Sequence, residues 1–455
     1  MTTLLWLRQD LRLSDQPALA AALAEGPVIP VYILDDQTPK HRKMGGASRW
    51  WLHHSLAALD AELREKGSRL ILRCGRADDE LDRLADETGT RRVHALRHYE
   101  PWWRNAERAV GNRLDLCLHD GNYLVPPGST RTQQGGLYRI YTPFWRALSA
   151  NLPPPAPLPA PRAVPGPADW PGSDRLADWH LLPTKPDWAG GLAGEWTPGE
   201  EGVRDRLDEF ADIAACYGTA RDLPSDEGTS RLSPHLHFGE LSPAQVWHRV
   251  ADKGGSVATF LGELGWRDYA ANLLLDFPDY GSRNGRAAFD DMPWRTGKAT
   301  AADLDAWQRG ETGYPIVDAG MRQLWTSGWI HNRVRMIVAS FLIKHLLIDW
   351  REGESWFWDT LVDADYGNNS VNWQWSAGSG VDANQFGRIM APLLQSEKFD
   401  AGSYIRRWVP ELGDLPESAI HDPEAAGCRP DAYPAKIIGH REARERALEA
   451  GKMLR

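Results

Sequence analysis

The sequence is short of cysteine, and it has neither a long apolar run nor a familiar nucleotide-binding fingerprint. The four cysteines, Cys74, Cys117, Cys216 and Cys428, are scattered and form no CxxC pair. They indicate neither a zinc site nor a disulfide framework, and we expect isolated buried thiols. No apolar stretch approaches the ~20 residues of a membrane span. Because the chain opens on an expected strand rather than a signal peptide, we predict a cytoplasmic protein that has no membrane partner.

The composition otherwise fits a globular protein of two or three domains. The chain has 455 residues, of which 42% are hydrophobic and 25% charged. The net charge of −10 argues mildly against nucleic-acid binding, although a local basic patch binds phosphates whatever the total charge. The unusual feature is a set of 22 tryptophans. Most must serve packing, but an indole also stacks on flat rings and loses one electron readily.

Residues 1–148 alternate short apolar runs with helical patterns, which predicts a parallel sheet that has helices on both faces. This segment contains neither GxGxxG nor a P-loop, so the fold alone does not identify a ligand. The expected strands are Leu4–Leu7, Val28–Leu34, Arg69–Arg73, Arg92–Leu96 and Leu114–Leu118, and the expected helices are Asp15–Ala24, Ser48–Lys66, Asp78–Glu87 and Trp102–Gly111.

Proline marks the end of this domain. Residues 151–172 contain PPPAP, PAP and PGP, and such a stretch favours an irregular surface linker. From residue 200 onward helical patterns dominate and no repeat of fixed period occurs. The predicted organisation is α/β plus all-α: a Rossmann-like parallel-sheet domain over 1–148, a Pro-rich linker over 149–199 and a helical domain over 200–455.

Two segments of the helical half combine polar groups with a flat or cationic side chain. In the segment 227–234, Thr229, Ser230 and Ser233 surround Arg231, which suits either a pyrophosphate cradle or an ordinary capped helix start. In ELGWRD, a helix places Glu263, Trp266 and Arg267 on one face. That face suits a nucleobase and its phosphate, or equally an amphipathic helix that buries its tryptophan.

Two further polar segments follow in the last third of the chain. In GWIHNRVRM, which ends at Met336, Asn332 and Met336 are one helical turn apart, and Arg333 and Arg335 point to different faces. The alternative is a cation-rich surface helix. Next, DADYGNN carries carboxylates and amides beside large aromatics from residue 363. It suits ribose binding or a turn with Asx caps, and it lacks the oxygen-rich loop of a hard-cation site, so we expect no metal.

Together and in this order, these segments resemble the photolyase/cryptochrome family, closest to class I cyclobutane pyrimidine dimer photolyases. The resemblance covers nearly the whole chain, from WLRQDLRL at residues 6–13 to KFD at 398–400 and HREAR at 440–444, with GYPIVDA and DWREGE between them. It implies an N-terminal α/β antenna domain and a C-terminal helical domain that binds FAD and DNA.

The resemblance also implies the residues that hold the cofactor. Asp363 and Asp365 would flank the ribose and the isoalloxazine side, Arg335 would pair with Asp363, and Asn369 would lie at the flavin N5. A neutral amide suits that place because it hydrogen-bonds N5 in either redox state without adding charge. The remaining implied FAD contacts are Tyr217, Thr229, Ser230, Arg231, Leu232 and Ser233.

In the implied reaction, light excites reduced flavin, one electron passes to a cyclobutane dimer in UV-damaged DNA, the ring opens, and the electron returns. Photolyases are among the enzymes that flip their target out of the stack, so the resemblance implies that the dimer leaves the duplex. Glu263 would hydrogen-bond the dimer and Trp266 would stack on it. Phosphate contacts should make binding fall with salt. The other residues expected to face the DNA are Arg221, Arg267, Asn332, Arg333, Met336 and Gln395.

Members of the family reduce their flavin through a relay of tryptophans. The matching positions are Trp373 nearest the flavin, then Trp350, then Trp294 near the surface. The antenna chromophore stays open between methenyltetrahydrofolate, a deazaflavin, another flavin or none. Glu100 matches a folate-binding position, but the Cys–Lys pair of folate-binding members falls at residues 281–282, which are Gly and Ser.

Two rival functions stay open, and a third is disfavoured. One is a blue-light sensor that binds FAD and repairs nothing, although such plant-type proteins commonly lose the Trp and Glu kept here at 266 and 263. Another is a (6-4) photolyase, whose pocket carries histidines where this chain has Asn332 and Met336. The third is a dark flavin oxidoreductase, for which nothing resembles a nicotinamide site. We expect a monomer.

Overall fold

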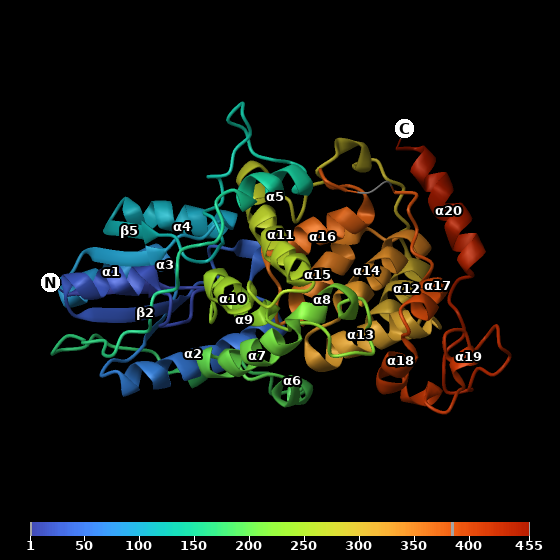
Figure 1. The fold of residues 1–455 in the computed structure, drawn as a ribbon, viewed down its shortest axis with the longest axis horizontal. Helices are drawn as coiled ribbons and strands as arrows, with labels where there is room; N and C mark the ends of the chain where they lie inside the picture. Colours follow the sequence, from blue (N-terminus) through green and yellow to red (C-terminus); the bar gives the residue numbers. More distant parts are fainter. Residues whose placement is uncertain (1, 384–385, 455) are drawn as a thin grey trace. The chain divides into compact units, whose positions relative to one another are not determined.

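The chain forms two compact units in the computed structural model, which describes residues 2–383 and 386–454. Unit 1 contains residues 1–215, 230–278 and 362–365, and unit 2 contains residues 216–229, 279–361 and 366–455. Figure 1 labels most of their helices and the strands β2 and β5. Three separate stretches of chain thus contribute to each unit.

A parallel sheet forms the core of unit 1. Its order is β3-β2-β1-β4-β5, and each pair is parallel, with Leu4 of β1 opposite Ile29 of β2 and Val93 of β4. Every residue of β1 and β2 is buried because helices cover both faces of the sheet. The strands are β1 (Thr3–Leu7), β2 (Val28–Leu34), β3 (Ile71–Cys74), β4 (Arg92–Leu96) and β5 (Asp115–His119).

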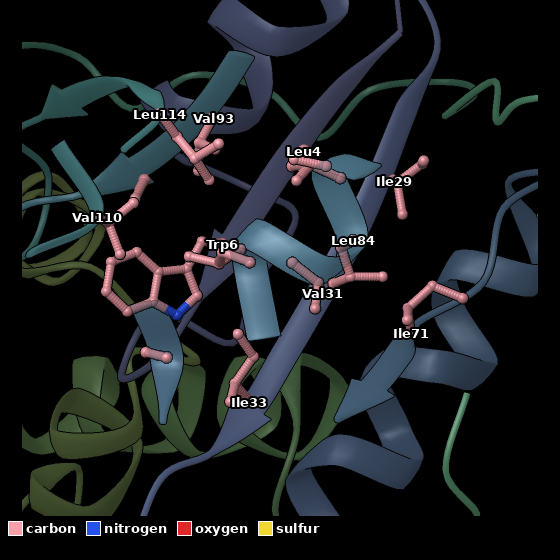
Figure 2. Packing of buried hydrophobic residues seen from close by; sticks show 14 of the residues in the cluster. Leu4, Trp6, Ile29, Val31, Ile33, Ile71, Leu84, Val93, Val110 and Leu114 are labelled. Carbon is pink, nitrogen blue, oxygen red and sulfur yellow. The ribbon is translucent and has the colours of Figure 1, made fainter. Parts of the chain in front are cut away.

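The order of the strands decides which helices cover which face. The chain moves outward from β1 to β3 and then returns through β4 to β5, so right-handed crossovers place the first two helices on one face and the next two on the other. Figure 2 shows the second face, where Leu84 and Val110 pack on Trp6 and Val31. These helices are α1 (Pro17–Glu25), α2 (Gly46–Glu65), α3 (Ala77–Thr88) and α4 (Pro101–Gly111).

The other regular elements are mainly helices, which irregular stretches such as residues 150–175 connect. The other α-helices of unit 1 are α5 (Tyr141–Ser149), α6 (Gly190–Glu195), α7 (Glu200–Ile213), α9 (Ser233–Phe238), α10 (Pro243–Val250) and α11 (Val257–Asp276). Those of unit 2 are α8 (Tyr217–Ala220), α12 (Lys298–Arg309), α13 (Pro315–Ser327), α14 (Asn332–Ser340), α15 (Trp350–Thr360), α16 (Tyr366–Ala377), α17 (Pro392–Lys398), α18 (Gly402–Trp408), α19 (Glu417–Ile420) and α20 (His440–Lys452), with a π-helical turn over Phe341–His345.

The structure confirms the predicted fold class, a parallel-sheet α/β part followed by a helical part. The predicted strands match within one or two residues at each end. The three predicted domain ranges stay a prediction. Within residues 2–383 and 386–454, no helix combines the length and the apolarity needed to cross a membrane, and no group of three or more potential metal ligands gathers.

The expectation of buried thiols was wrong. Cys74, Cys216 and Cys428 are exposed, and Cys117 is half-buried. Cys74 and Cys117 lie on β3 and β5, which are the two edges of the sheet and so are covered less completely than the central strands.

Candidate functional site

Helix α11 presents the predicted lesion-binding residues. Glu263 and Trp266 are three residues apart and half-buried, while their neighbours Leu264 and Gly265 are buried. The helix can therefore offer one carboxylate and one indole on the same partly open face. This arrangement suits a flat polar ligand, because the indole can stack on it while the carboxylate accepts its N–H groups.

Tyr141, at the start of α5, covers one face of Trp266. The two ring centroids are 3.6 Å apart and the ring planes differ by 9°. The hydroxyl of Tyr141 donates a hydrogen bond of 2.6 Å to the backbone oxygen of Gly262, on α11. Tyr269 meets the Trp266 ring edge-on at 5.6 Å. Sequence reasoning missed Tyr141, whose only signal is an aromatic run at helical spacing.

The side chain of Arg267 contacts other residues of unit 1. Its guanidinium donates to the backbone oxygens of Asn122 and Leu236 and lies over the ring of Tyr123 at 4.5 Å. These contacts tie α11 to α9, so the helix that carries Glu263 is fixed to the segment predicted to contact FAD. The expected DNA contact of Arg267 stays a prediction.

Asp268 anchors α11 in a similar way. It is 1% exposed, and its carboxylate accepts hydrogen bonds from the backbone N–H groups of Leu124 and Val125. Burial raises the pKa of Asp268 to about 7, although Arg267 and the two N–H groups oppose that shift. Two neutral N–H donors offset only part of the cost of removing a carboxylate from water, and this explains why the pKa of Asp268 is raised.

The segment Ser230–Ser233 enters α9 through an unusual backbone. Arg231 has a φ of +52°, a left-handed conformation that costs a non-glycine residue about 1–3 kcal/mol. Its guanidinium binds Glu195 at 2.8 Å and lies over the ring of Trp196 at 4.6 Å. The side chain of Leu232 is buried, and that of Ser233 is exposed. The strain is sustained because Glu195 and Trp196 fix the Arg231 side chain.

The two predicted ribose-side carboxylates, Asp363 and Asp365, belong to unit 1 although the flanking residues belong to unit 2. Asp365 Oδ2 is 3.8 Å from Nδ1 of His237, a buried residue of α9. Among the described residues, that nitrogen has no hydrogen-bond partner. His237 was missed by the sequence prediction, and it brings a titratable ring to the carboxylates predicted to hold the ribose.

Asn369, on α16, has a fixed amide orientation. Its Nδ2 donates to the backbone oxygen and to Oε1 of Glu354, each at 3.0 Å. Glu354 is 1% exposed and Asn369 is 8% exposed. Both amide hydrogens are thereby used, and the amide oxygen remains as an acceptor. Glu354 is a further residue that the sequence prediction missed, because its role depends on the packing of α15 against α16.

Two arginines of unit 2 that are predicted to face DNA contact a carboxylate or aromatic rings of the same unit. Arg333 pairs with Asp222 and lies over the ring of Phe399 at 4.4 Å. Arg221 lies over the ring of Tyr217 at 5.2 Å. Arg333 is half-buried and partly neutralised, so its expected phosphate contact stays a prediction. The remaining predicted residues of unit 2 are exposed Asn332 and half-buried Thr229, Met336 and Gln395.

His331 directly precedes α14, and Arg335 lies within that helix. His331 Nδ1 accepts from the backbone N–H of Arg333 at 3.2 Å and so caps the helix. Burial, followed by the charge of Arg333, lowers the pKa of His331 to about 4. Arg335 Nε donates to the backbone oxygen of Ile330 at 2.8 Å. Its predicted partner Asp363 belongs to unit 1, and that pairing stays a prediction.

The three tryptophans of the predicted relay all belong to unit 2. Trp373 and Trp350 are buried, and Trp294 is half-buried, in line with a sequence that runs from the interior toward the surface. Trp350 Nε1 donates to Asn284 at 3.0 Å. Trp373 instead meets Trp307, at a centroid distance of 6.3 Å. The order of electron transfer through the three residues stays a prediction.

Unit 1 also contains a cavity of about 480 Å³, whose lining includes Arg97, Tyr99, Arg104 and Arg108. No residue predicted to bind FAD or DNA lines it. Glu100 is 4% exposed and accepts a hydrogen bond from the backbone N–H of Tyr99 at 3.2 Å. The link between Glu100 and a folate antenna stays a prediction, and the identity of a second chromophore stays open.

Comparisons with known proteins agree with this arrangement. A family model described as DNA photolyase matches residues 3–162, and one described as the FAD binding domain of DNA photolyase matches residues 260–453. The deoxyribodipyrimidine photo-lyase of Agrobacterium fabrum is 49% identical over 98% of this chain and 97% of its own. Cryptochrome-1 of Arabidopsis thaliana is 35% identical over 98% of this chain and 70% of its own.

A solved structure resembles the whole chain as well. The bacterial class III photolyase from Agrobacterium tumefaciens superposes with a TM-score of 0.94 at 48% identity, covering 100% of this chain and 97% of that one. A parallel-sheet unit combined with a helical FAD-binding domain defines the class of flavin-dependent photolyases and cryptochromes. This chain belongs to the DNA photolyase family. The expected closeness to class I within that family stays a prediction, since this similar structure is a class III photolyase.

The residues present fit FAD. Asn369 is held with its amide hydrogens on Glu354, so its oxygen can accept the N5–H that a reduced flavin carries. His237 Nδ1, buried near Asp365, is a further polar atom that has no hydrogen-bond partner among the described residues. Buried polar atoms are normally satisfied, so an unsatisfied one beside predicted ribose ligands agrees with a bound polar group.

Proposed function

We propose that this protein is a deoxyribodipyrimidine photo-lyase, which uses light to split cyclobutane pyrimidine dimers in UV-damaged DNA. The observation that carries the proposal is the open face of α11, where Glu263 and Trp266 lie three residues apart and half-buried. A relative that is 49% identical over nearly the full length bears the same activity in its name.

The bound FAD supplies the light-driven one-electron chemistry, and the chain supplies binding and orientation. Trp266 stacks on the displaced dimer, and Glu263 hydrogen-bonds it and stabilises the added charge. Asn369 accepts from N5 without adding charge of its own. Ser230, Arg231 and Ser233 bind the pyrophosphate, and Asp363 and Asp365 bind the ribose side.

The same proposal includes the partners. DNA that contains pyrimidine dimers is the substrate, and Arg221, Arg333 and Gln395 contact its backbone near the lesion. The protein acts as a monomer in the cytoplasm. Asn332 and Met336 stand at positions where the family resemblance places histidines in (6-4) photolyases, which favours the cyclobutane lesion over the (6-4) lesion.

Blue-light repair assays on matched oligonucleotides test this proposal. Purified protein with reduced flavin is given one duplex that carries a cyclobutane dimer and another that carries a (6-4) lesion. We expect repair of the first alone. Repair of the second alone would make the protein a (6-4) photolyase, and flavin photochemistry without repair of either would make it a blue-light sensor.

A further inference from the structure

Three aromatic rings lie in parallel layers beside the proposed lesion site. Tyr141 stacks on Trp266, with ring centroids 3.6 Å apart and ring planes 9° apart, and its ring is also nearly parallel to that of Trp145, at 6.4 Å and 13°. Two free rings prefer an offset or edge-on arrangement to a close face-to-face overlap. The surrounding contacts must therefore impose this stack, and the structure shows which contacts do so.

The Tyr141 hydroxyl provides the first of these contacts. It donates at 2.6 Å to the Gly262 backbone oxygen, one turn before Trp266 on α11. Gly265 provides the second, since an added Cβ there would lie 2.3 Å from a ring carbon of Trp145. The missing side chain lets α5 approach α11 closely enough for the rings to stack. Tyr269 lies beside the edge of the Trp266 ring, and their ring centroids are 5.6 Å apart.

Trp266 keeps part of its surface accessible. Among the residues that the structure describes, its ring neighbours are Tyr141 on one face and Tyr269 on the edge, and the residue is only half-buried. An indole held on one face has fewer rotamers to lose when a ligand stacks on the other. Holding a binding group in its bound conformation in advance raises affinity.

We infer that Tyr141 is a positioning residue for lesion binding, which holds Trp266 flat so that its open face receives the displaced dimer. This inference rests on the proposed function. Burial and then the charge of Glu263 raise the pKa of Tyr141, so the hydroxyl stays protonated and keeps its hydrogen bond.

The test compares Tyr141→Leu with Phe144→Leu. Phe144 lies one turn further along α5 and is 2% exposed; it packs on Tyr269 at 5.5 Å. Both substitutions remove an aromatic ring between α5 and α11, but only the first uncovers Trp266. Tyr141→Phe keeps the ring and loses the hydroxyl, which is one of the two contacts that hold the ring in place. The measurements are the Kd for a dimer-containing duplex and for its intact counterpart, the FAD content, and the repair yield at saturating DNA.

We expect Tyr141→Leu to weaken binding of the dimer duplex about tenfold relative to Phe144→Leu. Binding of intact duplex, FAD content and saturating repair yield should change far less. Tyr141→Phe should recover part of the affinity, because the close approach at Gly265 still holds the ring. Equal dimer affinities for the two leucine variants would overturn the inference while leaving the proposed function in place. A wild-type protein that neither prefers nor repairs the dimer duplex would overturn both.

Discussion

Gly353 is the position at which one methyl group should disturb the electron path most directly. It lies on α15, and an added Cβ would be 2.1 Å from Trp373 Cη2 and 2.6 Å from a methyl carbon of Leu342. Trp373 is 3% exposed and packs against Phe357 at 5.0 Å and Trp307 at 6.3 Å, so neighbouring rings restrict its movement. Gly353→Ala must therefore push Trp373 out of place.

Two opposing effects determine how much Gly353→Ala changes the free energy of unfolding. Overpacking a full core costs about 1–3 kcal/mol, and two simultaneous overlaps favour the upper end. Replacing glycine in a helix interior with alanine contributes about 1 kcal/mol of stability. The net loss is about 2 kcal/mol, which corresponds to a Tm lower by roughly 4–8 °C for a unit of this size.

The matched control is Gly111→Ala at the end of α4, where an added Cβ meets nothing within 4 Å. Its Tm should stay the same or rise. Thermal release of FAD, followed by flavin fluorescence, measures both variants, and transient absorption measures photoreduction. If Gly353→Ala has the same Tm as Gly111→Ala and its flavin is photoreduced at the wild-type rate, the packing argument and the role of Trp373 are both refuted.

Three more outcomes are expected. Glu263→Ala should lower the repair yield per photon more than it lowers FAD content, because it removes the carboxylate from the open face of α11; equal yields for variant and parent would contradict its role. Trp350→Phe should abolish photoreduction of oxidised flavin while chemically reduced enzyme still repairs, and an unchanged photoreduction rate would remove Trp350 from the relay. The pKa of His331 is lowered to about 4 in the folded protein against ~6.5 unfolded, so the unfolded state binds a proton first and stability falls as the pH drops from 6.5 toward 4. This dependence amounts to about 3 kcal/mol, and urea unfolding of His331→Asn, which keeps a helix-capping acceptor, should show a shallower loss over that range; identical pH profiles would refute the assignment.

Local sequence determined the sheet and its helices. Apolar runs such as VIPVYIL, which forms β2, allow little besides a buried strand, and alternation with helical segments then dictates parallel pairing. The face shared by Glu263 and Trp266 was likewise predictable, because helical spacing fixes which residues point the same way. The family resemblance identified the flavin positions by the order of short motifs along the chain.

Tertiary structure decided how those residues are held. Tyr141 is 125 positions from Trp266 along the chain, and no local pattern indicates that their rings stack. The guanidinium of Arg267 donates to two backbone oxygens that lie far from it in the sequence, while its expected DNA contact stays a prediction. Periodicity specifies the direction of a side chain, but the group that covers or satisfies it comes from segments that only the folded chain brings together.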